Sequence, residues 1–321
     1  MSTPGYFILS LDTELSMGFF DMDNERHARF SPDGQEERQA IRSVLSLCEK
    51  YDISATWAIT GFIFHQQNET PRRGPLENWQ RAIKRHSAAF DTSSPLCYGV
   101  DIVQAILDSP QAKEIGFHGY THRPFPTLDA AEAQFELEEW KRLAARHQLT
   151  GTSVVFPRNA IAHLDQVKDS GFLCYRGHDR IPRPSEIFPF LEVLDHLFPI
   201  SKLPVYDVNA SAIDSSGLVN LPGSQHLFYD DLSAENILTV LNLHKRRLNR
   251  IFKGIETAAA EGKMVHLWAH PWEFRSAAAL EILEDVLSFV AQKIAQGRIH
   301  SVTMTEIAKS ILDFSRGEAG K

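Results

Sequence analysis

Two acidic residues and a pair of histidines have the types and spacing needed to hold a metal ion. Asp12 and Glu14 lie two residues apart where the apolar segment YFILSLD ends, so in an extended chain both carboxylates point to the same side. His118 and His122 follow another apolar segment with the spacing H-x3-H. Two imidazoles and one carboxylate can hold Zn²⁺ or a similar ion and leave one position open for a reacting group. These residues are therefore candidates for a hydrolytic metal site.

Each of these patterns also has a purely structural interpretation. An acidic pair after a strand is typical of a turn or a helix start, and Asp12 and Glu14 alone would favour that interpretation. In a chain with 14 histidines, an H-x3-H pair such as His118 and His122 can arise by chance. The spacing therefore supports a metal site mainly because both patterns stand at the ends of predicted apolar strands.

A second H-x3-H pair, His266 and His270, lies inside the apolar segment MVHLWAHPWEF. On a strand the two residues share one face, and Pro271 ends the strand, which places His270 at the rim and His266 deeper. A histidine with a pKa near its usual value of about 6.5 suits a general acid working near neutral pH. A capping or core role for His270 is the structural alternative.

Arg158 follows another apolar segment, in VVFPRN. It can hold a carboxylate bidentately or form a surface salt bridge.

Short apolar segments rich in β-branched and aromatic residues alternate with segments of helical periodicity, which predicts an α/β fold with a mostly parallel sheet. Strands are predicted at 6–12, 53–61, 114–120, 152–157, 172–177, 217–223, 264–270 and 298–304. Helices are predicted at 36–50, 129–149, 233–261 and 277–296. Because the carboxyl ends of parallel strands meet at one edge of a sheet, the candidate residues should converge there.

The bulk composition excludes several classes of protein. With 321 residues, 43% hydrophobic and 23% charged, the chain is long enough to bury a sizeable core. The net charge of -8 speaks against nucleic acid or an anionic membrane as the main partner. The three dispersed cysteines fit a reducing compartment. We find neither a signal-peptide pattern nor an apolar run of about 18 residues, and we expect a cytoplasmic protein without a membrane span.

Two polar, turn-rich stretches at 65–99 and 180–209 interrupt the alternation of strands and helices. Long irregular insertions in a compact domain usually form lids or binding loops. Because the chain has no linker composition and no internal repeat, we predict one catalytic domain over residues 1–321. The two insertions are expected to select the substrate.

The motifs resemble, in order along the chain, those of the polysaccharide deacetylase family (NodB homology, carbohydrate esterase 4). SLDTE at 10–14 is similar to the paired-acid motif, and HGYTH at 118–122 is similar to the metal-binding motif. FPRN at 156–159 resembles the arginine motif, and HLWAHP at 266–271 resembles the late histidine motif. The pattern is most similar to a cytoplasmic subgroup associated with surface-polysaccharide gene clusters. This resemblance implies a distorted (β/α) barrel with about seven parallel strands.

The resemblance also implies roles for individual residues. Asp12 would be the general base, and Arg158 would orient it. His118 and His122 would be metal ligands, and His270 would be the general acid. The implied cofactor is a divalent metal ion, first of all Zn²⁺, with Co²⁺, Mn²⁺ or Ni²⁺ as alternatives. The implied reaction is removal of an acyl group, acetyl in the first instance, from an N-acylated sugar carried by a nucleotide, a lipid or an oligosaccharide.

The chain departs from the family pattern in the acid pair. The family typically has two adjacent aspartates, the second a metal ligand, whereas here Thr13 occupies that place and Glu14 follows. Either Glu14 reaches the metal, or Asp12 does and the base is reassigned, or the site holds metal weakly or not at all. We predict Glu14 as the ligand.

The same residues leave two other functions open. One is a deformylase or cyclic-amide hydrolase, and the other is a non-catalytic carbohydrate-binding protein with a degenerate site.

Backbone N–H groups of Tyr120 or Thr121 are predicted to stabilise the oxyanion of the reaction. Three tryptophans near the candidate residues, Trp57, Trp268 and Trp272, either stack on a sugar or belong to the core.

Overall fold

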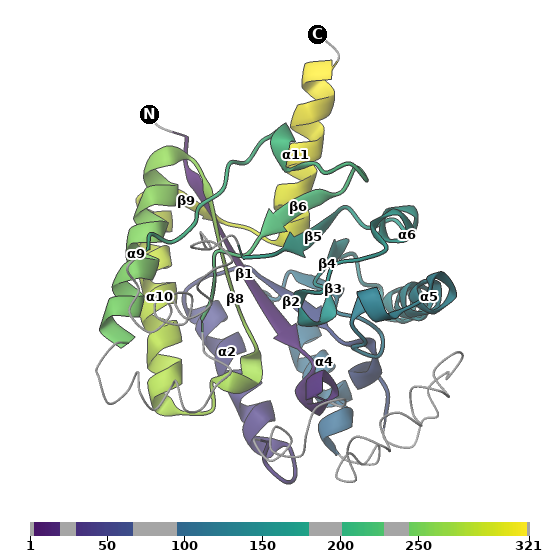
Figure 1. Ribbon diagram of the computed structural model, residues 1–321. Helices are drawn as coiled ribbons and strands as arrows, with labels where there is room; N and C mark the ends of the chain where they lie inside the picture. The colour runs from purple at the N-terminus through teal and green to yellow at the C-terminus, as the bar shows by residue number, and fades with distance from the viewer. Residues whose placement is uncertain (1–2, 20–29, 67–94, 180–200, 228–243, 320–321) are drawn as a thin grey trace, which may run out of the picture.

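The computed structural model describes residues 3–19, 30–66, 95–179, 201–227 and 244–319 (Figure 1). The strands are β1 Gly5–Thr13, β2 Ala55–Ile59, β3 Glu114–Phe117, β4 Ser153–Val154, β5 Cys174–Gly177, β6 Val219–Pro222, β7 Gln225–His226, β8 Met264–Ala269 and β9 Ile299–Ser301. The α-helices are α2 Gln35–Lys50, α4 Val100–Asp108, α5 Ala130–Arg146, α6 Leu164–Asp169, α9 His244–Glu261, α10 Ala277–Ala295 and α11 Met304–Ala319.

The strands form one parallel sheet that curls into a distorted barrel. Their order is β6-β5-β4-β3-β2-β1-β8-β7, and β9 pairs with the first residues of β1. The two outer strands, β6 and β7, are separated along the chain only by Gly223 and Ser224. One continuous stretch therefore forms both edges of the sheet, with the Gly223 N–H donating to the carbonyl of Gly177 and the Ser224 N–H to that of His266. The predicted α/β barrel is confirmed, and β6 with β7 acts as one interrupted strand.

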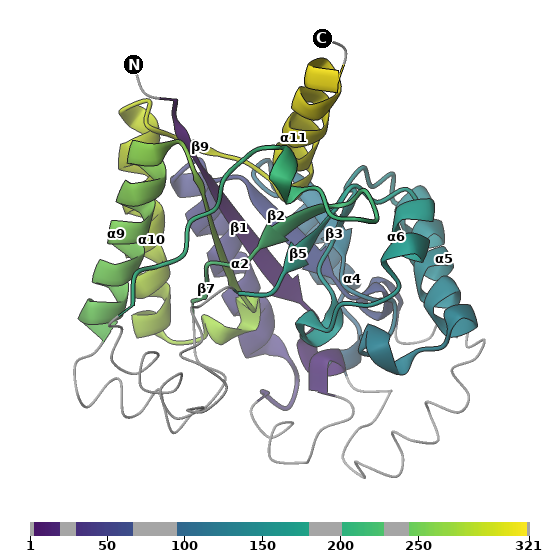
Figure 2. The ribbon, with the colours of Figure 1, turned by 45° about the horizontal axis from the view of Figure 1, so that its top comes forward.

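Strand β1 lies at the centre of the sheet because its sequence suits burial on both faces. Phe7, Leu9 and Leu11 on one face and Ile8 on the other are fully buried, and burial of each such side chain contributes roughly 1.5–3 kcal/mol. Figures 1 and 2 show α9 and α10 on one side of the strands and α5 and α6 on the other. The helices thus cover the outside of the barrel, and the strand ends stay free to form a site.

The predicted elements match the observed ones closely. All eight predicted strands are present, and within the described residues the two-residue strand β7 is the one strand that was missed. The predicted helix at 233–261 is observed as α9 from residue 244, and residues 233–243 lie outside the described part. Helices α4, α6 and α11 were not predicted.

The two predicted insertions are described only at their ends, since residues 67–94 and 180–200 lie outside the described residues, and their role in substrate selection stays a prediction. None of the described helices combines the length and apolar character needed to cross a membrane.

Candidate active site and metal centre

A pocket of about 310 Å³ lies at the carboxyl end of the central strands and collects the predicted metal and catalytic residues. It is lined by Asp12, Glu14, Gly18, Phe19, His118, His122, Arg158, Asn159, Trp268 and His270. These residues come from segments spread over most of the chain, so the curled parallel sheet is what brings them together.

The acid pair converges on the pocket as the alternation along β1 predicted. Asp12 and Glu14 are both buried against it, while the hydroxyl of Thr13 donates to the carbonyl of Leu11 at 3.3 Å. Gly18, in the 3-10 helix η1 (Leu15–Phe19), permits this arrangement, because a Cβ there would lie 2.0 Å from Glu14 Oε1. The conformation of Glu14 therefore depends on a glycine one helical turn further along the chain.

Glu14 faces two imidazoles with one carboxylate oxygen. His118 Nε2 lies 2.8 Å and His122 Nε2 2.6 Å from Glu14 Oε2. The three residues are buried and offer ligand atoms within 4.8 Å of one another. His118 Nδ1 lies 2.8 Å from the carbonyl of Val155, which can only accept, so Nδ1 carries a proton and Nε2, beside Glu14, is the atom that could bind a metal ion. This is how a metal-binding histidine is usually oriented.

The surroundings of His122 show whether Glu14, His118 and His122 together suit a bound cation. The His122 side chain is 2% exposed, its Nε2 lies 2.6 Å from Glu14 Oε2, and its Nδ1 has no hydrogen-bond partner among the described residues. A cation held between Nε2 and the Glu14 carboxylate would offset the cost of burying both groups. Burial, offset in part by Glu14, lowers the pKa of His122, which favours the neutral form that binds metal. The donor set of Glu14, His118 and His122 therefore fits a divalent metal ion.

The loop that carries the two histidines is anchored by a buried carboxylate on α5. Gly119 and His122 have left-handed backbones, with φ of 74° and 63°. Glu136 Oε2 accepts the N–H groups of Tyr120 at 2.6 Å and Thr121 at 2.9 Å. These are the two N–H groups that we predicted for the oxyanion, and that prediction was wrong. Both are already bound by Glu136, which fixes the loop.

Asp12 is held by Arg176 at the end of β5. Arg176 donates to Asp12 Oδ1 at 2.7 Å and to Oδ2 at 2.6 Å, to Ser10 Oγ at 3.1 Å, and twice to Asn159 Oδ1. All five N–H donors of this buried guanidinium are thus used, and its central carbon lies 4.3 Å from the ring of Trp268. Burial alone would raise the pKa of Asp12, but the charge and hydrogen bonds of Arg176, together with the nearby His118 and His270, outweigh burial and lower that pKa. Asp12 is therefore an anion of fixed orientation.

The contact with Asp12 that we expected of Arg158 is made by Arg176. Arg158 lies exposed on the pocket wall, with a left-handed backbone at φ 57°. Arg158 follows the predicted strand 152–157, and Arg176 is the last residue but one of the predicted strand 172–177, so the strand-end rule that selected Arg158 applied equally to Arg176. The choice between them depends on the curvature of the sheet, which strand periodicity does not determine.

His270 stands at the rim, between the metal-ligand group and a second carboxylate. Its Nε2 lies 3.5 Å from Glu14 Oε1, and its Nδ1 lies 3.3 Å from Glu273 Oε1. Glu273 Oε2 also accepts the backbone N–H of His270 at 2.9 Å and lies 3.1 Å from His226 Nε2. Burial alone would lower the pKa of His270, but Glu273 and Glu14 raise it to about 10. Sequence reasoning missed Glu273, although it stands three residues after His270.

His266 lies below the pocket, as predicted. It is fully buried, with Nε2 2.9 Å from Ser10 Oγ and Nδ1 3.2 Å from the carbonyl of Leu221. Ser10 accepts from Arg176, so its own proton is free to donate to Nε2, which leaves the His266 proton on Nδ1. Burial lowers the pKa of His266 to about 3, and Arg176 adds to this. His266 is therefore a neutral link in the network that holds Arg176.

The three tryptophans divide between core and pocket. Trp57 is fully buried and Trp272 is nearly so, and neither lines the pocket. Trp268 does line it, and its Nε1 donates to Asp179 at 3.1 Å. The ring of His226 stacks on Trp268 with centroids 4.1 Å apart. Only Trp268 is placed to contact a molecule in the pocket.

Comparison with known proteins identifies the fold. No protein-family model matches this chain, and no curated protein matches it in sequence. A protein from Mycobacterium smegmatis assigned as a polysaccharide deacetylase has a similar structure, with TM-score 0.59, 14% identity and coverage of 97% of this chain and 94% of that one. Puue allantoinase is similar with TM-score 0.53, 13% identity and coverage of 95% and 89%. The 4-alpha-glucanotransferase of Thermococcus litoralis is similar with TM-score 0.51 and 12% identity, over 96% of this chain but 40% of that one.

The chain thus has a fold that is shared by proteins named for three different activities. A shared fold does not determine the reaction, so function must be argued from the pocket.

Proposed function

We propose that this protein is a metal-dependent hydrolase that removes an acyl group, in the first instance acetyl, from the nitrogen of an N-acylated sugar. The observation that carries the proposal is the convergence of Glu14, His118 and His122 on one point beside Asp12 and His270. The order of the motifs along the chain supports a sugar amide as the substrate, and the similar fold of a protein assigned as a polysaccharide deacetylase is consistent with it. We further propose that the sugar is attached to a carrier.

Asp12 has the properties of a proton acceptor. A divalent cation held by Glu14, His118 and His122 would supply Lewis acidity and lower the pKa of bound water. Arg176 keeps Asp12 ionised and uses one lone pair of each carboxylate oxygen, so both oxygens retain a lone pair that can accept a proton. In this proposal Asp12 takes the proton from the attacking water.

His270 has the properties of a proton donor to the departing amine. Its raised pKa keeps it protonated at neutral pH, and its position on the pocket lining lets Nε2 reach a bound molecule. Because the charge of Glu14 contributes to the high pKa after that of Glu273, a cation held at Glu14 would lower the pKa of His270 toward the range useful for catalysis. Glu273 holds the ring from the Nδ1 side.

The test measures metal content and acetate release on the same preparations. We expect bound metal after purification without chelators, its loss in Glu14→Gln, and acetate release from N-acetylated sugars that falls about 10²–10⁴-fold in Asp12→Asn and His270→Ala. If both variants keep wild-type turnover, the assigned roles are wrong.

The same assay separates the alternative functions. Formate release or ring opening in place of acetate would indicate a deformylase or a cyclic-amide hydrolase. Sugar binding without turnover in saturating Zn²⁺, Co²⁺ or Mn²⁺ would indicate a non-catalytic carbohydrate-binding protein.

A further inference from the structure

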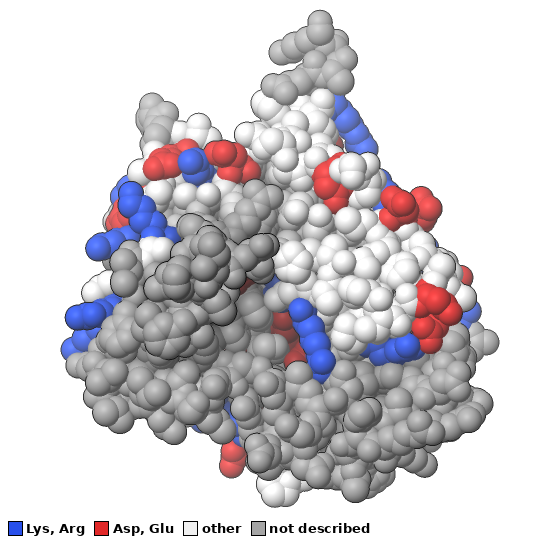
Figure 3. Space-filling model, viewed as in Figure 1, with Lys and Arg blue, Asp and Glu red and all other residues white. Residues whose placement is uncertain are grey.

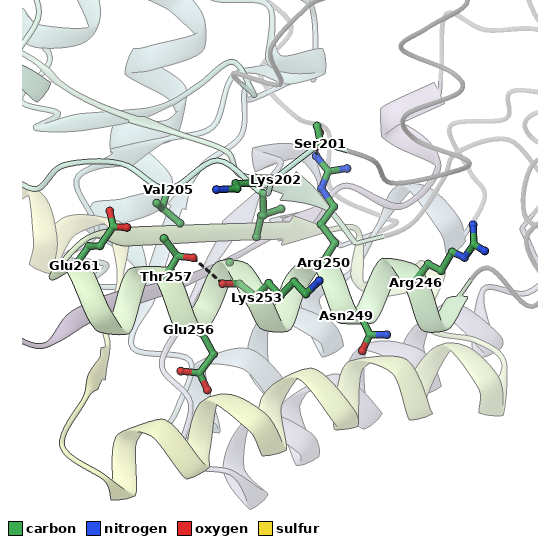
Figure 4. Close-up of a pocket in the computed structure, with 12 residues that line it drawn as sticks. Ser201, Lys202, Val205, Arg246, Asn249, Arg250, Lys253, Glu256, Thr257 and Glu261 are labelled. Atoms are coloured by element: carbon green, nitrogen blue, oxygen red, sulfur yellow. Dashed lines mark hydrogen bonds between the residues drawn. The ribbon is translucent and has the colours of Figure 1, made fainter.

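A second and larger pocket, of about 790 Å³, lies between α9 and residues 201–205. We call it the α9 groove. Figure 4 shows its lining side chains, which come from the helix on one side and from the extended segment on the other. Among the described residues, the α9 groove and the candidate active site have no lining residue in common.

Basic side chains line the α9 groove from both walls. Arg246, Arg250 and Lys253 stand at positions i, i+4 and i+7 of α9, which places them on one helix face over roughly 10 Å. Lys202 approaches from the opposite wall (Figure 4). Lys and Arg side chains are also seen along the α9 side of the surface in Figure 3. Four cations therefore line one cavity in a chain whose net charge is -8.

The floor of the groove is formed by close packing of the Leu203 side chain on the backbone of Gly254. Leu203 is buried and passes directly over Gly254, where a Cβ would lie 2.3 Å from Leu203 Cδ2. At the groove wall, Arg250 Nη2 donates to Ser201 Oγ at 2.9 Å and joins the helix to the segment. The backbone that carries the cations is thus held in place. The basic side chains that are exposed and accessible to a ligand are those of Lys202, Arg246 and Lys253.

The two acidic residues of the lining are engaged with other cations. Glu256 forms ion pairs with Lys293 on α10 and, at 3.1 Å, with Arg298, and Figure 4 shows it pointing away from the groove. Glu261 lies 2.9 Å from Lys263. Neither carboxylate therefore neutralises the basic wall.

Three of the four basic side chains lack an acidic partner in the described part of the chain. Within it, no carboxylate lies at ion-pair distance from Lys202, Arg246 or Lys253. A compact ligand with several negative charges suits such a site better than a single carboxylate, because one carboxylate balances only one cation. Arginine and lysine are also the usual partners of phosphate oxygens.

We propose that the α9 groove binds the diphosphate group of a small ligand. The inference does not depend on the deacetylase proposal, since it uses none of the active-site residues. Free pyrophosphate, a nucleoside diphosphate sugar and a diphosphate lipid share this chemistry, and the experiment separates them.

Binding of inorganic pyrophosphate to the full chain is measured by calorimetry in about 0.1 M salt, where exposed charges are partly screened. We expect a Kd below about 1 mM, which rises at least tenfold in Lys253→Glu and in Lys202→Glu. Lys245→Glu is the matched control, since this lysine is exposed on the same helix but does not line the groove. Its Kd should stay within twofold of wild type. Thermal unfolding of the variants verifies that each is folded.

The proposal is overturned if wild-type protein does not bind pyrophosphate, or if Lys253→Glu binds as tightly as Lys245→Glu. Equal binding by these two variants would also be the result expected if pyrophosphate bound to a metal ion in the active site instead of to the groove. Two further ligands identify the natural source of the diphosphate. If UDP-N-acetylglucosamine binds at least tenfold more tightly than pyrophosphate, the source is a nucleotide. If vesicles that contain polyprenyl diphosphate bind at least tenfold more tightly, the source is a lipid. Equal affinities assign the groove to the free anion. Loss of acetate release with pyrophosphate binding intact would reject the deacetylase proposal alone.

Discussion

Replacing Arg176 with methionine should have effects that the same change at Arg158 does not have. Arg176 and Asp12 form a fully buried, bidentate ion pair. Removing one partner of a buried pair typically costs about 3–5 kcal/mol, because it leaves the other charge without compensation. Arg158 is exposed, and an exposed ion pair contributes about 0–1 kcal/mol. Arg176→Met should therefore lower the free energy of unfolding by about 3–5 kcal/mol at pH 7, and Arg158→Met by less than about 1 kcal/mol.

The loss in Arg176→Met should also depend on pH, with a sign that the structure determines. In the wild type, the pKa of Asp12 is below its usual value, so the ion pair stabilises the fold above that value and is lost as the pH falls through the lowered pKa. Without Arg176, burial is the largest remaining influence and raises the pKa of Asp12. The variant should therefore regain stability on acidification, as Asp12 takes up a proton.

Urea unfolding of the wild type, the two single variants and Asp12→Asn/Arg176→Met at pH 7 and pH 5 is the appropriate assay. The double variant should recover part of the lost stability, because it no longer buries an uncompensated charge. A cost below about 1 kcal/mol for Arg176→Met would place the ion pair in the class of exposed pairs. That result, or an equal cost for Arg158→Met, would refute the assignment of Arg176 as the residue that holds Asp12.

Three further predictions concern the residues around this pair. Gly18→Ala should weaken metal binding about 10–100-fold by displacing Glu14, as measured by competition with a chromophoric chelator; unchanged affinity would show that Glu14 is not a ligand. Glu273→Gln should move the alkaline limb of the pH–rate profile to lower pH, because Glu273 raises the pKa of His270; an unmoved limb would exclude His270 as the acid. His266, with a pKa near 3 in the folded chain, should take up a proton on unfolding. Stability should therefore fall by about 2 kcal/mol between pH 7 and pH 5, and His266→Gln should remove this part of the pH dependence in urea unfolding.

The architecture of the sheet and its helices could be predicted from the sequence because local patterns of apolar residues determine it. The apolar run of β1 requires burial on both faces, and the recurrence of such runs between helical segments requires a parallel sheet. The two-residue strand β7 has no such pattern, and it forms only because Gly223 and Ser224 carry the chain from one edge of the sheet to the other. The sequence also could not predict that Glu136 binds the backbone N–H groups of Tyr120 and Thr121, since a carboxylate on a helix does not indicate which loop it will anchor.

For the candidate site, the sequence by itself determined which residues stand at strand ends and which face they share. Alternation along β1 places Asp12 and Glu14 on the same side, and the proline after His270 ends its strand at the rim. Only the tertiary structure decided their partners. It brings Glu14 to the two histidines, and it places Arg176 against Asp12. The physical reason is that strand periodicity sets the direction of a side chain, whereas the curvature of the sheet and the packing of its loops set the distance between side chains far apart in the chain.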